Sequence, residues 1–228
     1  MIVRYEQHCP VARATEVLGD SWTFLVVHEL LYGDRTAADL QQALPGLAGG
    51  LLSTRLRRLR AAGLVDDSVE ASRHTRYALT SAGRDLAPII DHLGHWGRRW
   101  LPSPGSRDLK PQLLVHDICR QIERSRLPPQ PAAIRVRFAE VPPPRQWWIV
   151  LSTEHVSARH SKPGLPDAIR IDCTLTALAQ IWLGHTSWLD AVREQTVRFT
   201  GSREMVHQAI HWIGTSRFSP ERPTTAAD

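Results

Sequence analysis

The sequence has few cysteines, and their spacing excludes the usual structural uses of this residue. Cys9, Cys119 and Cys173 are odd in number, and no two of them form a CxxC pair. An odd count without paired spacing argues against a disulfide framework and against a structural zinc site. We therefore predict neither disulfides nor a metal site.

Long apolar runs are also missing. No stretch of about 18 apolar residues is present, which argues against a membrane-spanning helix. The first ten residues, MIVRYEQHCP, lack the apolar core of a secretory signal. We expect a cytoplasmic protein with no membrane contact.

Lysine is nearly absent although the chain is basic. Lys110 and Lys162 are the two lysines, so 26 of the 28 basic residues are arginines, and the net charge is +5. Arginine suits bidentate contacts to phosphate and guanine, so this balance favours a polyanionic partner such as nucleic acid. A biased genome composition explains the same excess equally well, and both explanations stay open.

Proline is scarce in the first part of the chain and indicates where the domains divide. Three of the 16 prolines lie before residue 102. The stretch LPSPGSRDLKP reads as a linker, and 228 residues are enough for two domains. We predict domains at 1–101 and 111–218, a linker at 102–110 and a flexible tail at 219–228.

Hydrophobic periodicity predicts an α+β fold, with a mostly helical first domain that carries a β-hairpin and a second domain of strands followed by helices. In the first domain we expect helices at 10–18, 22–32, 37–44, 51–62 and 81–101, and hairpin strands at 64–69 and 74–80. In the second we expect helices at 111–124, 175–184, 186–195 and 202–214, and strands at 133–140, 145–152, 154–160, 167–173 and 196–201.

The helix after Gly49-Gly50 carries the sharpest signal. Leu52, Leu56 and Leu59 form one apolar stripe on a wheel of about 100° per residue. The opposite side carries Gly50, Ser53, Thr54, Arg57 and Arg58, with Arg55 and Arg60 flanking the stripe. Such a helix fits a major groove about 12 Å wide. An isolated basic helix is more often a solvated face, but a basic-tipped hairpin follows here, and that order is typical of a winged helix-turn-helix.

The residues of this domain resemble the HxlR family of winged-helix transcriptional regulators, which is MarR-like. The resemblance is carried by Cys9-Pro10, by Leu18-Gly19-Asp20-Ser21-Trp22-Thr23, by Leu51-Leu52-Ser53-Thr54-Arg55-Leu56, by Gly63-Leu64-Val65 and by Tyr77-Ala78-Leu79-Thr80-xx-Gly83. Ala48 departs from the family because a serine or threonine often caps the recognition helix there, and Ala37 replaces a common aromatic residue.

The resemblance implies a homodimer that binds double-stranded DNA, most simply as a repressor. It makes 51–62 the recognition helix and 66–75 the wing loop, and it places the dimer contacts on the first and last helices, with Trp96 and Trp100. A dimer presents its recognition helices about 34–36 Å apart, so we expect a pseudo-palindromic operator. The expected DNA-binding residues are Ser53, Thr54, Arg55, Arg57, Arg58, Arg73, His74 and Arg76.

Residues 111–218 resemble a sterol-carrier (SCP2-like) domain. The resemblance rests on Asp172-Cys173-Thr174-Leu175-xx-Leu178-xxx-Trp182-Leu183-Gly184 and on Val197-xx-Thr200-Gly201-Ser202-Arg203-Glu204. It implies a sheet covered by helices around an apolar tunnel, and hence a hydrophobic small-molecule effector. The expected ligand-binding residues, each of which is equally compatible with a packed core, are Trp147, Trp148, Trp182, Trp188 and Trp212.

Two other functions stay open, and one class is disfavoured. Cys9 at a helix start is a redox candidate, since a thiol there has a lowered pKa; a packed interface residue is the alternative. The second open function is that of a lipid carrier with little DNA-binding role. We expect no enzyme and no cofactor, because the sequence has no GxGxxG, GxxxxGK[ST] or GxSxG motif, and the His92/His95 and His207/His211 pairs lack an obvious third ligand.

Overall fold

The computed structural model describes residues 4–69 and 75–220. The chain divides into two compact units, Met1–Leu101 and Pro102–Asp228. Each unit has its own hydrophobic core and is described by itself.

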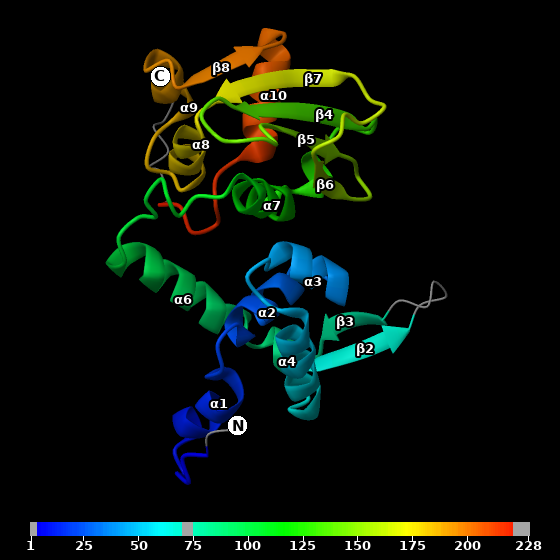
Figure 1. Cartoon of the computed structure of the whole chain (residues 1–228), viewed down its shortest axis with the longest axis vertical. Coiled ribbons are helices and arrows are strands. Elements are labelled where there is room, and N and C mark those ends of the chain that lie inside the picture. The colour runs from blue at the N-terminus through cyan, green and yellow to red at the C-terminus, as the bar shows by residue number, and fades with distance from the viewer. Residues whose placement is uncertain (1–3, 70–74, 221–228) are drawn as a thin grey trace. The chain divides into compact units, whose positions relative to one another are not determined.

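The first unit is mostly helical and carries a small antiparallel sheet (Figure 1). Its helices are α1 (Pro10–Leu18), α2 (Thr23–Leu30), α3 (Ala37–Ala43), α4 (Gly49–Ala61), α5 (Ser81–Arg84) and α6 (Ala87–Trp100). Its strands are β1 (Arg35–Thr36), β2 (Val65–Val69) and β3 (Thr75–Leu79), in the order β1-β3-β2. The α3–α4 pair followed by the β2–β3 hairpin confirms the predicted winged helix-turn-helix.

Side-chain caps set where two of these helices begin. Thr36 accepts a hydrogen bond from the Asp39 amide, and the Asp39 carboxylate accepts one from the Thr36 amide, so the two residues form a capping box at the start of α3. Thr80 caps α5 in a similar way through the Gly83 amide. These reciprocal bonds satisfy amides that have no partner within the helix.

The prediction of one continuous helix over 81–101 was wrong. The structure has a short α5, a break at Asp85 and Leu86, and then α6. Pro88 lies in the first turn of α6. Because proline has no amide hydrogen and its ring clashes with the carbonyl four residues earlier, it is tolerated in a first turn and not in a helix interior.

The second unit combines a five-stranded sheet with helices. Its helices are α7 (Pro111–Gln121), the 3-10 helix η1 (Arg124–Arg126), α8 (Leu175–Trp182), α9 (Trp188–Arg193) and α10 (Arg203–Ile213). Its strands are β4 (Ala132–Phe138), β5 (Gln146–Leu151), β6 (Val156–Arg159), β7 (Asp167–Cys173) and β8 (Val197–Thr200). The α+β prediction is confirmed; the sterol-carrier resemblance stays a prediction.

The sheet of the second unit has one face packed under helices and an opposite face, called here the open face, on which Arg137 and Arg170 are exposed while Trp148 and Val150 are buried. The strand order is β6-β5-β4-β7-β8, with β4 and β7 parallel and the other pairs antiparallel. Alternate residues, such as Ile134, Ile149 and Ile171, join the core formed with α7, α8, α9 and α10. Since side chains alternate along a strand, the residues between them form the opposite face.

Candidate nucleic-acid interface

The packing of α4 fixes which of its sides is free. Leu52, Leu56 and Leu59 are 1%, 2% and 1% exposed and belong to the core of the first unit. Full burial of a leucine contributes about 1.5–3 kcal/mol, so these three side chains hold the helix in one orientation about its axis. The predicted apolar stripe is confirmed, and the side carrying Ser53 and Arg57 is exposed.

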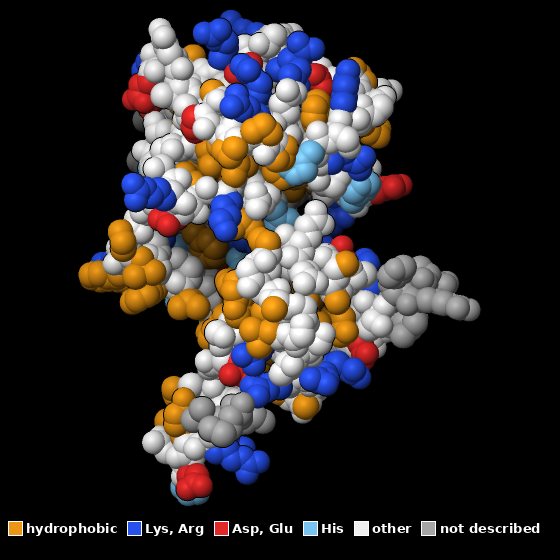
Figure 2. Space-filling view, in the orientation of Figure 1, with side chains coloured by type: hydrophobic (Ala, Val, Ile, Leu, Met, Phe, Trp, Pro, Cys, Tyr) orange, Lys and Arg blue, Asp and Glu red, His pale blue; other side chains and the backbone are white. Residues whose placement is uncertain are grey.

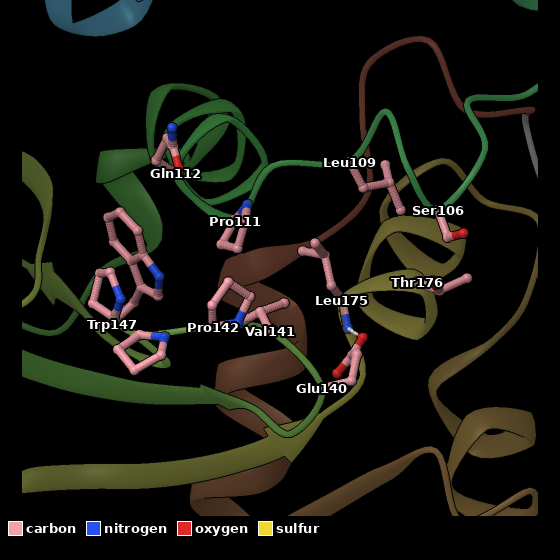
Figure 3. Close-up of a pocket in the computed structure, with 12 residues that line it drawn as sticks. Ser106, Leu109, Pro111, Gln112, Glu140, Val141, Pro142, Trp147, Leu175 and Thr176 are labelled. Carbon is pink, nitrogen blue, oxygen red and sulfur yellow. Dashed lines mark hydrogen bonds between the residues drawn. The ribbon is translucent and has the colours of Figure 1, made fainter.

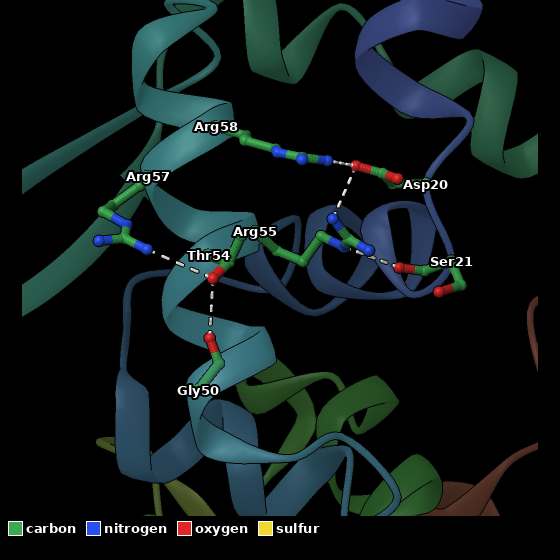
Figure 4. A network of polar contacts seen from close by, with 7 residues as sticks. All are labelled: Asp20, Ser21, Gly50, Thr54, Arg55, Arg57 and Arg58. Carbon is green, nitrogen blue, oxygen red and sulfur yellow. Dashed lines mark hydrogen bonds and ion pairs between the residues drawn. The ribbon is translucent and has the colours of Figure 1, made fainter. Parts of the chain in front are cut away.

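The first turns of the exposed side carry short hydroxyl side chains. Ser53 donates to the Gly49 carbonyl over 3.0 Å and Thr54 donates to the Gly50 carbonyl over 2.9 Å. The Thr54 hydroxyl also accepts a hydrogen bond from Arg57 Nη2 at 3.3 Å (Figure 4). A Cβ added to Gly50 would meet nothing within 4 Å. This end of α4 therefore leaves room for another backbone to approach.

A polar network on the other side of α4 holds two of its arginines to Asp20, in the segment between α1 and α2 (Figure 4). Arg55 Nη1 lies 2.6 Å from the Asp20 carboxylate, and its Nε donates to the Ser21 carbonyl over 3.0 Å. Arg58 pairs with the same carboxylate. Asp20 therefore ties α4 to the start of α2.

Arg55 needs a correction as a DNA contact. The residue is 7% exposed and its guanidinium points into the unit toward Asp20. The wheel placed it beside the leucine stripe, and the ion pair provides the charge partner that a buried guanidinium requires. Arg58 is partly engaged, with a side chain 28% exposed. Arg57 is exposed and turned away from this network (Figure 4).

The hairpin lies next to α4. Arg60 Nη2 is 2.8 Å from the Asp67 carboxylate on β2. Arg57, Arg60, Asp66 and Asp67 border a hollow of about 650 Å³ on this side of the unit. Arg76 on β3 is partly exposed and pairs in register with Ser68. Two further predicted contacts, Arg73 and His74, lie outside the described residues.

An apolar strip of α6 is exposed. Leu93, Trp96 and Trp100 are 46%, 53% and 65% exposed, and Ile89, one turn earlier, is 51% exposed. Val11 of α1 is 72% exposed. Figure 2 shows hydrophobic side chains gathered around the C-terminal end of α6. A contiguous apolar surface of this kind is typical of an interaction site.

The three thiols differ in environment. Cys9 is exposed at the N-cap of α1, where the amides of Ala12 and Val11 lower its pKa. Burial raises the pKa of Cys119 to about 12. Burial also raises the pKa of Cys173, and the nearby carboxylates of Glu140 and Asp172 raise it further. Cys9 is therefore the thiol poised to react.

Among the described residues, two hollows are lined by different tryptophans, one by Trp147 and another by Trp212, and the single tunnel stays a prediction. Three indole nitrogens are used internally, since Trp148 donates to Asp167, Trp182 to Asp117 and Trp212 to the Arg126 carbonyl. The buried nitrogens of Trp147 and Trp188 have no hydrogen-bond partner among the described residues. All five side chains are less than 10% exposed, and all but Trp148 belong to the core of the unit.

Trp147 lines a hollow of about 410 Å³ (Figure 3). The remaining wall is largely apolar, with Leu109, Pro111, Val141 and Leu175 among its residues. At its edge Glu140 accepts a hydrogen bond from the Leu175 amide over 2.5 Å, which caps α8. The volume lies within the range of small-molecule sites, about 300–1,000 Å³.

Metal sites and membrane-spanning helices were the two features of other protein classes to look for. Within 4–69 and 75–220, no group of three His, Cys, Asp or Glu side chains is placed to hold a metal ion. His92 instead contacts the Pro88 carbonyl at 2.6 Å, and His95 lies 3.9 Å from Asp91. In the same part of the chain, no helix combines the length and the apolar character needed to span a bilayer.

Comparison with known proteins identifies similar chains. Residues 17–104 match the family model described as HxlR-like helix-turn-helix. The HTH-type transcriptional regulator YvaP of Bacillus subtilis (strain 168) is 35% identical over 96 residues, 41% of this chain and 89% of the relative. The HTH-type transcriptional regulator Mb3122 of Mycobacterium bovis is 39% identical over 120 residues, 51% of this chain and 73% of the relative. Among solved structures, the redox regulator HypR in its reduced form is 27% identical with a TM-score of 0.38, covering 40% of this chain and 92% of that chain.

Proposed function

This chain belongs to the HxlR-like helix-turn-helix family of transcriptional regulators, and from that membership we propose that it binds an operator as a homodimer through α4. The observation that carries the proposal is the orientation of α4. Its leucines are buried, while Ser53 and Arg57 face solvent. A helix held this way presents short side chains and a guanidinium to a major groove.

The test is a titration of duplex DNA selected by the full-length protein, over a series of salt concentrations. We expect Arg57→Ala to weaken operator binding by about 1–3 kcal/mol if Arg57 contacts a base. If Arg57 contacts a phosphate, the salt slope falls by about 0.9. Arg193→Ala is the matched control, since that arginine is 69% exposed in the other unit. Unchanged affinity and salt slope for Arg57→Ala would remove the assignment of α4.

Four of the predicted contacts are proposed alongside Arg57. Ser53 and Thr54 have hydroxyl oxygens near the start of α4 that can accept as well as donate. Arg76 extends the surface onto the hairpin. Arg58 contributes its exposed fraction to the electrostatic attraction while Asp20 holds it. Arg55 is omitted because it is buried.

Repression by occupation of a promoter is the regulatory outcome that we propose. A protein bound across the start region excludes RNA polymerase and needs no activating contact. In transcription in vitro from a promoter with the selected operator, adding the protein lowers the transcript yield. A rise in yield would identify an activator instead.

We also propose that the hollow beside Trp147 takes a hydrophobic effector that carries a hydrogen-bond acceptor. The apolar wall suits the body of such a molecule. The unpartnered Trp147 nitrogen supplies a donor whose burial alone costs about 1–3 kcal/mol. Figure 3 shows the nitrogen-bearing edge of this ring on the side that faces Pro142.

Native mass spectrometry of the purified protein tests for a bound molecule, and Trp147→Phe removes the donor while keeping an aromatic ring. A ligand regulates only if its affinity differs between DNA-binding states. A ligand that raises the melting temperature and leaves operator affinity unchanged would contradict the regulatory role. If the purified protein contains bound lipid and shifts the mobility of no selected duplex, the lipid-carrier function would be favoured.

A thiol-based response is the second candidate, and the exposure of Cys9 together with its lowered pKa favours it. An oxidant that modifies Cys9 then releases the protein from DNA. The measurement is the loss of operator binding after diamide treatment, which Cys9→Ser abolishes. An identical loss in Cys9→Ser would exclude this role.

A further inference from the structure

The positive charge of this chain is concentrated away from the helix-turn-helix unit. Residues 102–228 carry 16 Lys and Arg against 12 Asp and Glu, whereas residues 1–101 carry 12 against 11. The second unit therefore holds +4 of the net +5. A family DNA-binding unit that is almost neutral, joined to a basic companion, raises the question of what that charge attracts.

Strand register gathers part of this charge on the open face of the five-stranded sheet. Five arginines, from four of the five strands, point to this face; they are Arg135 and Arg137 on β4, Arg159 on β6, Arg170 on β7 and Arg198 on β8. The intervening residues of each strand belong to the helix-covered core or pack against it. Figure 2 shows Lys and Arg side chains gathered over β7 and β8.

Register also places the arginines in rows. Arg135 pairs with Arg170 on one side and with Trp148 on the other, and Trp148 pairs with Arg159. Two residues further along, Arg137 pairs with Asp172, which pairs with Arg198. With strands about 4.8 Å apart, the two rows together extend over about 19 Å from Arg159 on β6 to Arg198 on β8, and the rows lie about 7 Å from each other.

Carboxylates on this face hold arginines in place without cancelling the charge. The Asp167 side chain is 7% exposed and lies 3.1 Å from Arg170 and 4.0 Å from Arg135. It also accepts a hydrogen bond from Trp148, whose ring lies under the Arg135 guanidinium at 5.9 Å. Asp172 pairs with Arg137. Two carboxylates against five arginines leave three positive charges.

The two arginines nearest the sheet edges are the most available. Arg159 and Arg198 are exposed, and neither has a carboxylate partner among the described residues. Arginine favours phosphate because its planar guanidinium forms bidentate hydrogen bonds and is weakly hydrated. A flat row of such groups suits a repeating anion better than one small ligand.

We propose that this sheet face is a second DNA contact, which binds the phosphate backbone of duplex outside the bases read by α4. The inference rests on the proposed function, because it takes duplex DNA as the polyanion that this family member meets. A span of about 19 Å corresponds to about five phosphates along one strand at 3.4 Å each. Contacts to phosphate carry no sequence information, so this face adds affinity and no specificity.

The test compares two double variants of the full-length protein that remove the same charge. R159A/R198A removes the two unpaired arginines of the face. R193A/R203A is the control, because these arginines lie on α9 and α10 and are also exposed. Each variant is titrated with the selected operator and with unrelated duplex of equal length, at salt concentrations from about 0.05 to about 0.3 M. Circular dichroism checks that both fold.

For R159A/R198A we expect the slope of log affinity against log salt to become shallower by about 1.8. Near 0.15 M salt this corresponds to about 30-fold weaker binding. Operator and unrelated duplex lose the same factor, so their affinity ratio is unchanged. The control keeps the slope of the unmodified protein.

Equal slopes for the two double variants would overturn the proposal. The proposal would also be overturned if R159A/R198A lost affinity only for single-stranded RNA or for vesicles of anionic lipid, since the face would then serve another polyanion. The proposed function fails separately, when Arg57→Ala leaves both the operator affinity and its salt slope unchanged. The two results are independent because the substituted arginines lie in different units of the chain.

Discussion

At the scale of single residues, Asp20 shows how a side chain outside α4 can fix the surface that we propose for DNA contact. The sequence suggested Asp20 or Ser21 as a cap for the second helix, whereas the structure has Trp22 at that N-cap and pairs Asp20 with two arginines of α4. Composition cannot reveal this, because residues 51–60 contain no acid and the partner lies in a different segment. Only the fold brings residue 20 against residue 55.

Asp20→Asn tests that role. The substitution keeps the shape and removes the charge, which leaves the Arg55 guanidinium buried with only the Ser21 carbonyl. Loss of a buried ion-pair partner costs about 3–5 kcal/mol, and because Asp20 is 29% exposed we expect about 2 kcal/mol. Urea unfolding measures the change, with Arg57→Ala as a control that alters stability by less than about 0.5 kcal/mol. Equal stability of the two variants would show that Asp20 is not structural.

Cys9 should behave as the reactive thiol of the chain. Amides at the start of α1 favour the thiolate, so its pKa lies below that of an ordinary cysteine. The thiolate therefore persists to lower pH than in a model peptide. The rate of alkylation by iodoacetamide should fall at a lower pH in the protein than in the peptide. Mass spectrometry of the native protein should find Cys9 labelled, while Cys119 and Cys173 react after unfolding because burial raises their pKa values. A Cys9 midpoint at or above that of the peptide would contradict this.

At the scale of elements, sequence patterns located most helices and strands, and their errors have identifiable causes. The strand 167–173 was predicted to the residue, since alternating Ile169 and Ile171 between polar neighbours is a clear period of two. The break before α6 was missed because Leu86, Ile89 and Ile90 keep helical spacing across it. The short β1 was missed because two residues have no period.

The start of α4 offers a second test at this scale. Ala48 is the N-cap of α4 and provides no side-chain hydrogen bond. Its backbone is already extended, with φ of −61° and ψ of 140°, as an N-cap serine requires. Ala48→Ser should therefore stabilise the protein by about 1 kcal/mol in urea unfolding. Thr36→Ala removes an existing cap and should destabilise the protein by a similar amount. A destabilising Ala48→Ser or a neutral Thr36→Ala would undermine the assignment of the caps.

At the scale of the whole molecule, our two proposals assign a separate source of DNA affinity to each unit. Sequence reading assigned the basic charge to DNA binding in general, and it placed the specific contacts on a unit with almost no net charge. Register, which a single sequence leaves undefined, aligns the arginines of distant strands on one face. The tryptophans show the converse, because the sterol-carrier resemblance suggested one pocket, whereas four of the five rings pack in the core of the second unit.

A pseudo-palindromic operator requires two copies of α4, so the proposed function depends on a dimer. The exposed strip of Leu93, Trp96 and Trp100 on α6 has the composition of a homodimer interface, and the proposed dimer buries it. Trp96→Glu places a charge in that interface, so we expect sedimentation equilibrium to shift from dimer to monomer. Cooperative binding to an operator with two half-sites should be lost in the same variant, while binding to a single half-site is kept. Leu189→Glu, the same apolar-to-charged change at a side chain 58% exposed on α9, should leave the dimer intact. A Trp96→Glu protein that remains dimeric would exclude α6 as the interface.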